Sequence, residues 1–280
     1  MSEPVRPTQR EYWNSKVGEE WARQADRTDT MFAALTETAM TALALAPGER
    51  VLDIGCGAGA TTLAAARQVG PGGRAVGVDI SQPLLALARE RSQSSRLDVS
   101  FIEADAANAD VPGGPFDAAF SRFGVMFFED AIAAFARIRR SLRSNGRLVF
   151  VCWRTFPENG WSWTPVKAIE PMLAAPLPPP DPNLPGPFFF ADEGKIRSVL
   201  AGAGWREAGV ERWDGPLVIG ADASDAAAYL LKIGPVARAI AEHGLDVVAV
   251  EQRLIEVLAQ AQTPRGVVLP AACWIVKATA

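Results

Sequence analysis

The chain has 280 residues, of which 49% are hydrophobic, and this is enough for one large domain or for a domain with an appendage. Its formal net charge of −4 argues against a nucleic-acid partner, because proteins that bind nucleic acids usually carry a basic surface. Residues 1–10 contain no apolar signal core, and no run of about 18 apolar residues exists to span a membrane. We therefore expect a cytoplasmic protein.

Cysteine and histidine are scarce. The cysteines are too scattered for a disulfide framework and lie in apolar runs, which favours buried thiols in a reducing compartment: Cys56, Cys152 and Cys273. The sequence has no Cys/His spacing typical of a metal site and no evident Ser–His–Asp set. Neither a metal centre nor a hydrolase is expected.

Two helices are predicted before the first strand. Apolar side chains at every fourth residue predict an amphipathic helix over 11–25, with Trp13, Val17, Trp21 and Ala25 on one face. Asp29 or Thr30 is expected to cap a second helix, which ends at Pro47-Gly48. We expect residues 1–46 to form a helical lid, with ordinary packing as the alternative role of its tryptophans.

From residue 50 the pattern alternates between strands and helices. Strands are predicted over 50–55, 74–80, 99–103, 116–121 and 146–153, and helices over 60–69, 83–91 and 129–143. Several strands are continuous apolar runs, as expected when both faces of a sheet are covered. The fold class is therefore α/β, a Rossmann-like doubly wound domain with a mostly parallel sheet, whose core spans 47–155.

The rhythm breaks after residue 153. Residues 155–187 are rich in proline and predict a long irregular loop. A helix over 192–203 and a strand over 207–213 follow, then helices over 224–232, 235–242 and 246–260, and a closing strand over 271–278. We assign 156–190 to an insertion over the active site, and 191–280 to completion of the sheet with a helical cap on the acceptor side.

The stretch 51–62, VLDIGCGAGATT, predicts a buried strand, a tight glycine turn and the start of a helix. The turn satisfies both the G-x-G-x-x-G/A pattern of dinucleotide sites and a G-x-G-x-G pattern. Asp79 closes the second strand, where an acid accepts hydrogen bonds from ribose hydroxyls. These features indicate an adenosine-type cofactor without settling which one.

Other polar residues favour one cofactor. Asp53 lies two residues before the first glycine, where its charge would repel a pyrophosphate and suit a cationic amino-acid group. Asp105 follows the third strand, where a carboxylate could accept from an adenine amino group. Ser121 ends the fourth strand, at the edge where ligands bind in open α/β sheets.

Ordered motifs carry a family resemblance: VLDIGCGAG (51–59), GVDIS (77–81), EADA (103–106), FDAAFSRFGVMFF (116–128) and LRSNGRLVFVCW (142–153). The chain resembles the class I S-adenosylmethionine-dependent methyltransferases, in the broad group similar to the ubiquinone/menaquinone-biosynthesis enzymes. The resemblance implies a seven-stranded sheet with an antiparallel C-terminal strand. It also implies S-adenosylmethionine as cofactor and S-adenosylhomocysteine as product.

The resemblance also implies roles for single residues. Gly55, Cys56, Gly57 and Gly59 would cradle the methionine part of the cofactor, Asp53 would support its amino group, and Asp79 would bind the ribose. Ile80 would pack on the adenine, Asp105 and Ala106 would meet the adenine edge, the backbone of Ser121 would meet the methionine end, and Trp13 would close over the cofactor. The alternatives are helix–strand packing for Gly59 and a turn at Asp105. The group usually has Pro-Gly-Gly where this chain has Ser144-Asn145-Gly146, and we expect Asn145 to keep the turn left-handed.

The methyl acceptor is expected over the carboxyl ends of the fourth and fifth strands. Candidate lining residues are Arg122, Phe123, Met126, Phe127, Trp153 and Trp161, with core packing as the alternative. They predict a small apolar or aromatic acceptor. We favour methylation on oxygen or carbon over methylation on nitrogen, although the fold itself does not specify the atom. No catalytic residue is assigned; His243 is a candidate base, with a surface role as the alternative.

Other functions and assemblies stay open at this stage. An NAD(P)-dependent oxidoreductase fits the glycine turn but not Asp53. A non-catalytic S-adenosylmethionine-binding protein fits every cofactor motif. A homodimer is a further open alternative for its assembly.

Overall fold

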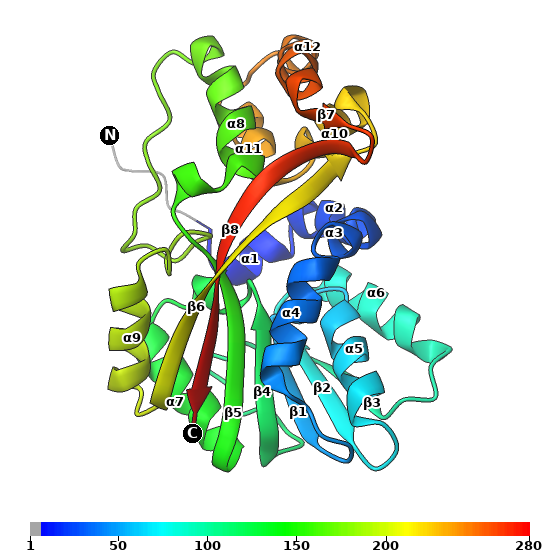
Figure 1. Ribbon diagram of the computed structural model, residues 1–280, viewed down its shortest axis with the longest axis vertical. Coiled ribbons are helices and arrows are strands. Elements are labelled where there is room, and N and C mark those ends of the chain that lie inside the picture. Colours follow the sequence, from blue (N-terminus) through cyan, green and yellow to red (C-terminus); the bar gives the residue numbers. More distant parts are fainter. Residues whose placement is uncertain (1–6) are drawn as a thin grey trace.

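The computed structural model describes residues 7–280 (Figure 1). The expectations for residues 1–6, which begin the polar N-terminus and the lid, lie outside this described part. The sheet has the order β3-β2-β1-β4-β5-β8-β6, and the short strand β7 (Gln262–Thr263) pairs with β8 outside that order. The parallel strands are β1 (Arg50–Ile54), β2 (Arg74–Asp79), β3 (Val99–Glu103), β4 (Phe116–Arg122) and β5 (Leu142–Trp153).

Strand β8 (Gly266–Thr279) runs antiparallel to both of its main neighbours, β5 and β6 (Arg206–Gly220). The doubly wound, mostly parallel sheet with an antiparallel C-terminal strand is thereby confirmed. Strand β5 begins earlier than predicted, because Leu142 pairs with Phe116 across a register shift. Asn145 has φ +62°, so the left-handed turn expected at this position is present.

Helices cover both faces of the sheet (Figure 1). One face carries α4 (Ala33–Leu43), α5 (Ala60–Val69) and α6 (Gln82–Gln93), and the other carries α7 (Ala131–Ser141) and α9 (Glu193–Gly202). The apolar strands are buried on both sides for this reason. The strand order reverses between β1 and β4, and in open sheets ligands bind at the carboxyl ends of strands beside such a reversal.

The N-terminal helices are shorter than predicted: α1 (Gln9–Trp13), α2 (Lys16–Arg23), α3 (Ala25–Met31) and then α4. The single helix predicted over 11–25 is wrong, because Asn14 and Ser15 end α1. The Ser15 hydroxyl accepts from the Val17 N–H at 3.2 Å and so begins α2. Asp29 does not cap a helix as predicted but lies within α3.

Strands β6 and β8 are longer than the predicted 207–213 and 271–278. Strand β5 pairs with β8 only as far as Trp153 opposite Cys273, whereas β6 and β8 remain paired up to Gly220 opposite Val267. Beyond β5 they form a two-stranded ribbon that curves away from the sheet (Figure 1). The extension includes Pro216, which lies opposite Pro270 although proline is disfavoured inside a sheet.

The ribbon carries the cap helices, α8 (Gly160–Ile169), α10 (Ala223–Leu230), α11 (Gly234–His243) and α12 (Val247–Leu258). Helix α8 replaces part of the irregular loop predicted over 155–187. Pro165 removes one backbone donor from this helix, and burial of Trp161, Val166 and Ile169 stabilises it instead. Among residues 7–280, no helix combines the length and apolarity that crossing a membrane requires.

Helix α3 joins the N-terminal helices to the cap. Arg27 donates to the Asp225 carboxylate at 2.9 Å and to the Ile219 carbonyl at 2.6 Å. The hydroxyls of Thr28 and Tyr229 hydrogen-bond at 3.0 Å. The carboxyl edge of the sheet is therefore enclosed by segments from both ends of the chain.

Candidate functional site

The turn between β1 and α5 contains three left-handed glycines. Gly55, Gly57 and Gly59 have φ values of +66°, +52° and +80°. A Cβ added to Gly59 would lie 2.7 Å from the Phe101 ring, so this glycine serves helix–strand packing. A Cβ added to Gly57 would meet no atom within 4 Å. Gly57 is therefore the position where another molecule can approach the main chain.

The turn is fixed where β1 and β4 diverge. A Cβ added to Gly55 would lie 2.7 Å from the Cα of Gly124, so the two main chains touch. The buried Ser121 hydroxyl donates to the Ile54 carbonyl at 2.8 Å and accepts from the Gly124 N–H at 3.2 Å. Its side chain thus joins the two strand ends, and contact of its backbone with a cofactor stays a prediction.

Asp53 is a buried carboxylate with unequal oxygens. The residue is 1% exposed, and its Oδ2 accepts from the hydroxyls of Thr61 and Thr62 at 2.6 Å each. Its Oδ1 is buried and has no hydrogen-bond partner within residues 7–280. Burial raises the pKa of Asp53 to about 6, against the opposing effect of the two hydroxyls. A cationic donor placed at Oδ1 would therefore be bound strongly.

Asp79 holds the other side of the turn. Its Oδ2 accepts from the Gly57 N–H and its Oδ1 from the Ser81 N–H, both at 2.8 Å. Burial raises the pKa of Asp79, and these backbone bonds oppose the shift. Each oxygen keeps a second lone pair, so the carboxylate can still accept from a vicinal diol.

The corner between α1 and α2 docks on the end of β2. The Trp13 carbonyl accepts from the Ser81 hydroxyl at 2.9 Å. Asn14 donates to the Ile80 carbonyl and accepts from the Gln82 N–H, both at 2.8 Å. The structure therefore places Trp13 and Ile80, both predicted cofactor residues, at the same strand end as Asp79.

A chain of ion pairs connects the turn to the N-terminal helices. Arg91 donates to the Ala58 carbonyl at 2.9 Å and to the Asp29 carboxylate at 3.0 Å. Arg122 donates to the other oxygen of Asp29 at 2.6 Å and to the Thr36 hydroxyl at 2.8 Å. Arg122, predicted to contact the acceptor, thus has two protein partners, and its contact with an acceptor stays a prediction.

The predicted acceptor residues separate into two groups. Phe123 and Trp153 stack with ring centroids 4.1 Å apart, and Trp161 lies 4.9 Å from Trp153. Phe127 makes an edge contact with Trp13 at 5.6 Å. Met126 is instead 1% exposed within the hydrophobic core, where core packing accounts for it.

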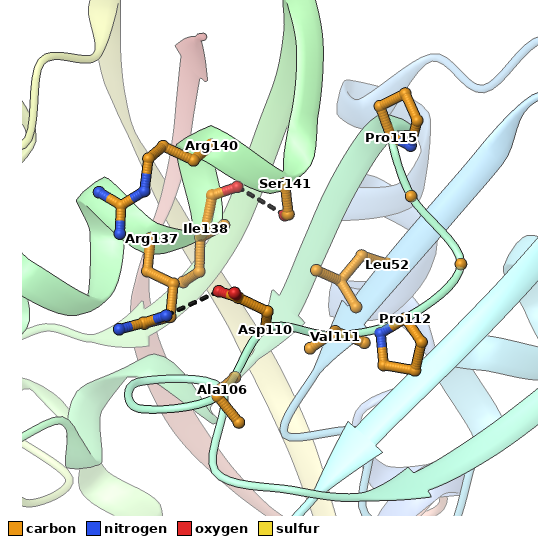
Figure 2. A pocket seen from close by; sticks show the side chains of 13 residues that line it. Leu52, Ala106, Asp110, Val111, Pro112, Pro115, Arg137, Ile138, Arg140 and Ser141 are labelled. Carbon is orange, nitrogen blue, oxygen red and sulfur yellow. Dashed lines mark hydrogen bonds and ion pairs between the residues drawn. The ribbon is translucent and has the colours of Figure 1, made fainter.

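After β3, Asp105 lies in a turn and Ala106 lies at a groove. The Asp105 oxygens accept from the Ala107 N–H at 2.9 Å and the Asn108 side chain at 2.7 Å, so Asp105 stabilises a turn. Ala106 lies at a groove of about 480 Å³ between the β3–β4 connection and α7. Figure 2 shows Arg137 reaching across that groove to Asp110. None of the turn glycines lines this groove, and adenine contacts of Asp105 and Ala106 stay predictions.

Two candidates point away from the turn. The Cys56 side chain packs toward β2, since a Cβ added to Gly77 would lie 2.8 Å from its sulfur. Burial raises the pKa of the Cys56 thiol, which keeps it neutral. His243 is exposed in the last turn of α11.

Several residues that shape the site were not predicted from the sequence. Gly124 is an isolated glycine just after a strand, a local signal for close backbone approach. Thr61 and Thr62 are hydroxyl residues directly after the turn, and they are the natural partners of a buried acid in the preceding strand. The Asp29–Arg91 pair has no local signal, because the partners lie 62 residues apart.

The strand order, the antiparallel β8 between β5 and β6 and the glycine turn after β1 define a class I methyltransferase fold. Residues 51–146 match the family described as "Methyltransferase domain". The resemblance inferred from the motifs is confirmed: residues 51–146 carry a methyltransferase domain, and the chain is similar to class I S-adenosylmethionine-dependent methyltransferases.

Named proteins are similar over this region. The nocamycin O-methyltransferase of Saccharothrix syringae is 34% identical over 169 residues, covering 58% of this chain and 60% of that protein. The demethylmenaquinone methyltransferase of Thermus thermophilus is 40% identical over 108 residues, covering 39% of this chain and 48% of that protein. The match thus spans only about half to three fifths of the length of these relatives.

A solved structure supports the fold alone. The phosphoethanolamine N-methyltransferase 2 of Haemonchus contortus, in complex with S-adenosyl-L-methionine, superposes with a TM-score of 0.60 at 17% identity. The superposition covers 100% of this chain and 61% of that one.

Two glycine substitutions should separate the cost of backbone strain from the cost of lost packing. Gly57→Ala should cost about 1–2 kcal/mol of unfolding free energy, because only the left-handed backbone is strained. Gly59→Ala should cost about 3 kcal/mol or more, because its Cβ also clashes with Phe101. Urea denaturation measures both, and equal losses would contradict the packing role of Gly59.

Asp29→Asn should loosen the N-terminal helices from the turn. It leaves two partly buried arginines without their shared carboxylate, and we expect a loss of about 2 kcal/mol in unfolding free energy. Asp26→Asn is the matched control, because Asp26 pairs with the same Arg91 but its side chain is 97% exposed. Equal effects of the two substitutions in thermal and urea unfolding would refute the ion-pair chain.

Proposed function

We propose that the protein binds S-adenosylmethionine at the glycine turn and transfers its methyl group to a small apolar or aromatic acceptor. One observation carries the proposal: within residues 7–280, the buried Asp53 carboxylate has an oxygen without a partner beside a turn that leaves space at Gly57. A cationic amino-acid group supplies both the positive charge and the N–H donors that this oxygen lacks.

The charges at the turn discriminate between adenosine cofactors. Burial raises the pKa of Asp53; the Thr61 and Thr62 hydroxyls and the charge of Arg122 oppose this shift, and the charge of Asp79 adds to it. Two neighbouring carboxylates disfavour the pyrophosphate of a nicotinamide dinucleotide. They suit a ligand with a sulfonium and an ammonium group, so the residues present fit S-adenosylmethionine.

The site residues divide the cofactor between them. Asp53 would hold the amino group, the main chain at Gly57 would lie along the methionine part, and Asp79 would accept from the ribose hydroxyls. Ile80 and Trp13 would cover the adenosine side from the end of β2. When bound, the cofactor supplies an activated methyl group, so the protein mainly orients the acceptor and excludes water.

The aromatic side chains favour a flat acceptor. Phe123, Trp153 and Trp161 form a continuous row beyond the turn. Relatives with printed names are a nocamycin O-methyltransferase and an aklanonic acid methyltransferase. The first of these names supports oxygen as the methylated atom. His243, exposed at the end of α11, has no part in this proposal.

The same proposal covers the kind of acceptor and the cellular location of the protein. The net charge of −4 favours a small-molecule acceptor over a nucleic acid. Three free, buried cysteines are compatible with the reducing cytoplasm.

Calorimetric titrations with S-adenosylmethionine, S-adenosylhomocysteine and NADH test the cofactor. We expect saturable binding of the first two only, about tenfold tighter at pH 7.5 than at pH 5, because the Asp53 pKa near 6 leaves it mostly protonated at pH 5. Asp53→Asn should bind weakly and lose this pH dependence. Binding of NADH alone would make the protein an oxidoreductase.

Turnover is tested separately from binding. Wild-type protein and S-adenosylmethionine are incubated with panels of phenols, quinones and amines, and methylated products are sought by mass spectrometry. Methylated phenols or quinones are the expected products. Tight cofactor binding without transfer to any panel would favour a non-catalytic binding protein.

Asp79→Asn should weaken S-adenosylmethionine binding at least about tenfold, because it removes a ribose acceptor and the anchor of the Gly57 N–H. Asp98→Asn is the control, since Asp98 is an exposed acid paired loosely with Arg74 at 3.7 Å. Calorimetry gives both affinities, and circular dichroism verifies folding. Unchanged affinity in a folded Asp79→Asn protein would remove Asp79 from the site.

A further inference from the structure

A row of aromatic rings starts beside the glycine turn. Phe123 and Trp153 stack with their planes 11° apart, and the Trp161 ring follows next to Trp153. Phe123 directly precedes Gly124, which touches Gly55. The row therefore leads from the proposed cofactor site to the first turn of α8.

Phe123, the first residue of the row, has an unusual backbone conformation. Phe123 has φ +66°, a left-handed value that a bulky residue rarely adopts. Its N–H donates to the Val151 carbonyl at 3.1 Å, and Phe32 packs against both Phe123 and Trp153. Strain of this kind is often retained at ligand sites.

Trp161 differs from two other buried tryptophans. Trp205 donates its Nε1–H to the Phe135 carbonyl at 3.0 Å, and Trp274 donates to the Ala191 carbonyl at 2.9 Å. Trp161 is 9% exposed, and its Nε1 is buried without a partner among the residues of the described chain. A buried donor without an acceptor is unfavourable unless a bound molecule supplies one.

The backbone that carries Trp161 is firmly placed. The buried Asn159 accepts from the Ala272 N–H at 2.9 Å and donates to the Thr155 carbonyl at 3.0 Å. The Asn159 carbonyl accepts from the N–H groups of Ser162 and Trp163 at 2.9 and 2.8 Å. These bonds tie the start of α8 to β8 and to the chain after β5.

We propose that Trp161 determines acceptor specificity by donating its indole N–H to a carbonyl or phenol oxygen of a flat ring. The ring lies along the row formed by Phe123 and Trp153. This inference rests on the proposed function, because it concerns the acceptor side of the same site. A ring without an oxygen leaves the buried donor unpaired, and sites with unpaired polar groups discriminate strongly against such analogues.

Calorimetric titration with naphthalene, 1-naphthol and 1,4-naphthoquinone, in saturating S-adenosylhomocysteine, tests the proposal. Wild-type protein should bind the two oxygenated rings about tenfold more tightly than naphthalene. Trp161→Phe keeps an aromatic ring and removes the N–H, so it should bind all three equally. Trp163→Phe is the matched control. Trp163 packs on Phe156, so this variant should keep the preference.

An unchanged preference in Trp161→Phe would overturn the proposal, and so would failure of wild-type protein to bind either oxygenated ring. If Trp161→Phe does not fold by circular dichroism, wild-type protein labelled with ¹⁵N-tryptophan decides. A slowly exchanging indole N–H signal should then move downfield with 1,4-naphthoquinone but not with naphthalene, and absence of that movement overturns the proposal.

Failure of the proposed function has a different signature. It would appear as absence of S-adenosylmethionine and S-adenosylhomocysteine binding in wild-type protein. The three ring titrations, repeated without S-adenosylhomocysteine, still compare wild-type protein with Trp161→Phe in that case. A preference lost in the variant would then support Trp161 as a ring-oxygen donor even without methyl transfer.

Discussion

Contact between two main chains, at Gly55 and Gly124, is the constraint on which the site depends. The turns after β1 and β4 meet where the strand order reverses, and no side chain fits between them. This contact fixes the glycine turn over the end of the sheet, with Asp53 beneath it. It also fixes Gly124, and with it the neighbouring Phe123 in its left-handed conformation. The proposed cofactor and acceptor sides are thus held by one point of backbone packing.

The buried carboxylates around this contact need hydrogen-bond donors or cationic partners. The free energy of a buried carboxylate is high unless donors surround it, and Asp79 has two backbone N–H donors. Asp53 accepts from two hydroxyls on one oxygen, and its other oxygen has no partner in the described part of the chain. Arg91 and Arg122 both pair with the Asp29 carboxylate, so each of these arginines has an anionic partner within the protein. Among these groups Asp53 is the one that a cationic ligand would complete.

The parallel core was predictable because its signals are local. Apolar runs, the glycine turn and Asp79 all lie within short stretches whose period and spacing have direct physical meaning. On the acceptor side, the surroundings of Arg122 and Met126 were not predictable, since their partners come from distant segments. Arg122 is paired by α3 and α4, and Met126 is enclosed by the core. The β6–β8 ribbon is also longer than predicted, and it contains Pro216 opposite Pro270, residues that sequence patterns do not favour inside a paired strand.

The proposed cofactor side and the proposed acceptor side therefore depend on different kinds of interaction. The glycine turn depends on backbone conformation and on buried charge, which tolerate few alternatives at each position. The acceptor side depends on side chains from the N-terminal helices, the strand ends and α8, whose apolar contacts tolerate changes of shape. A fold arranged in this way can keep one cofactor while its acceptor changes. The indole N–H of Trp161, which has no acceptor among the described residues, adds a directional requirement to the proposed acceptor surface, so shape alone does not define the acceptor.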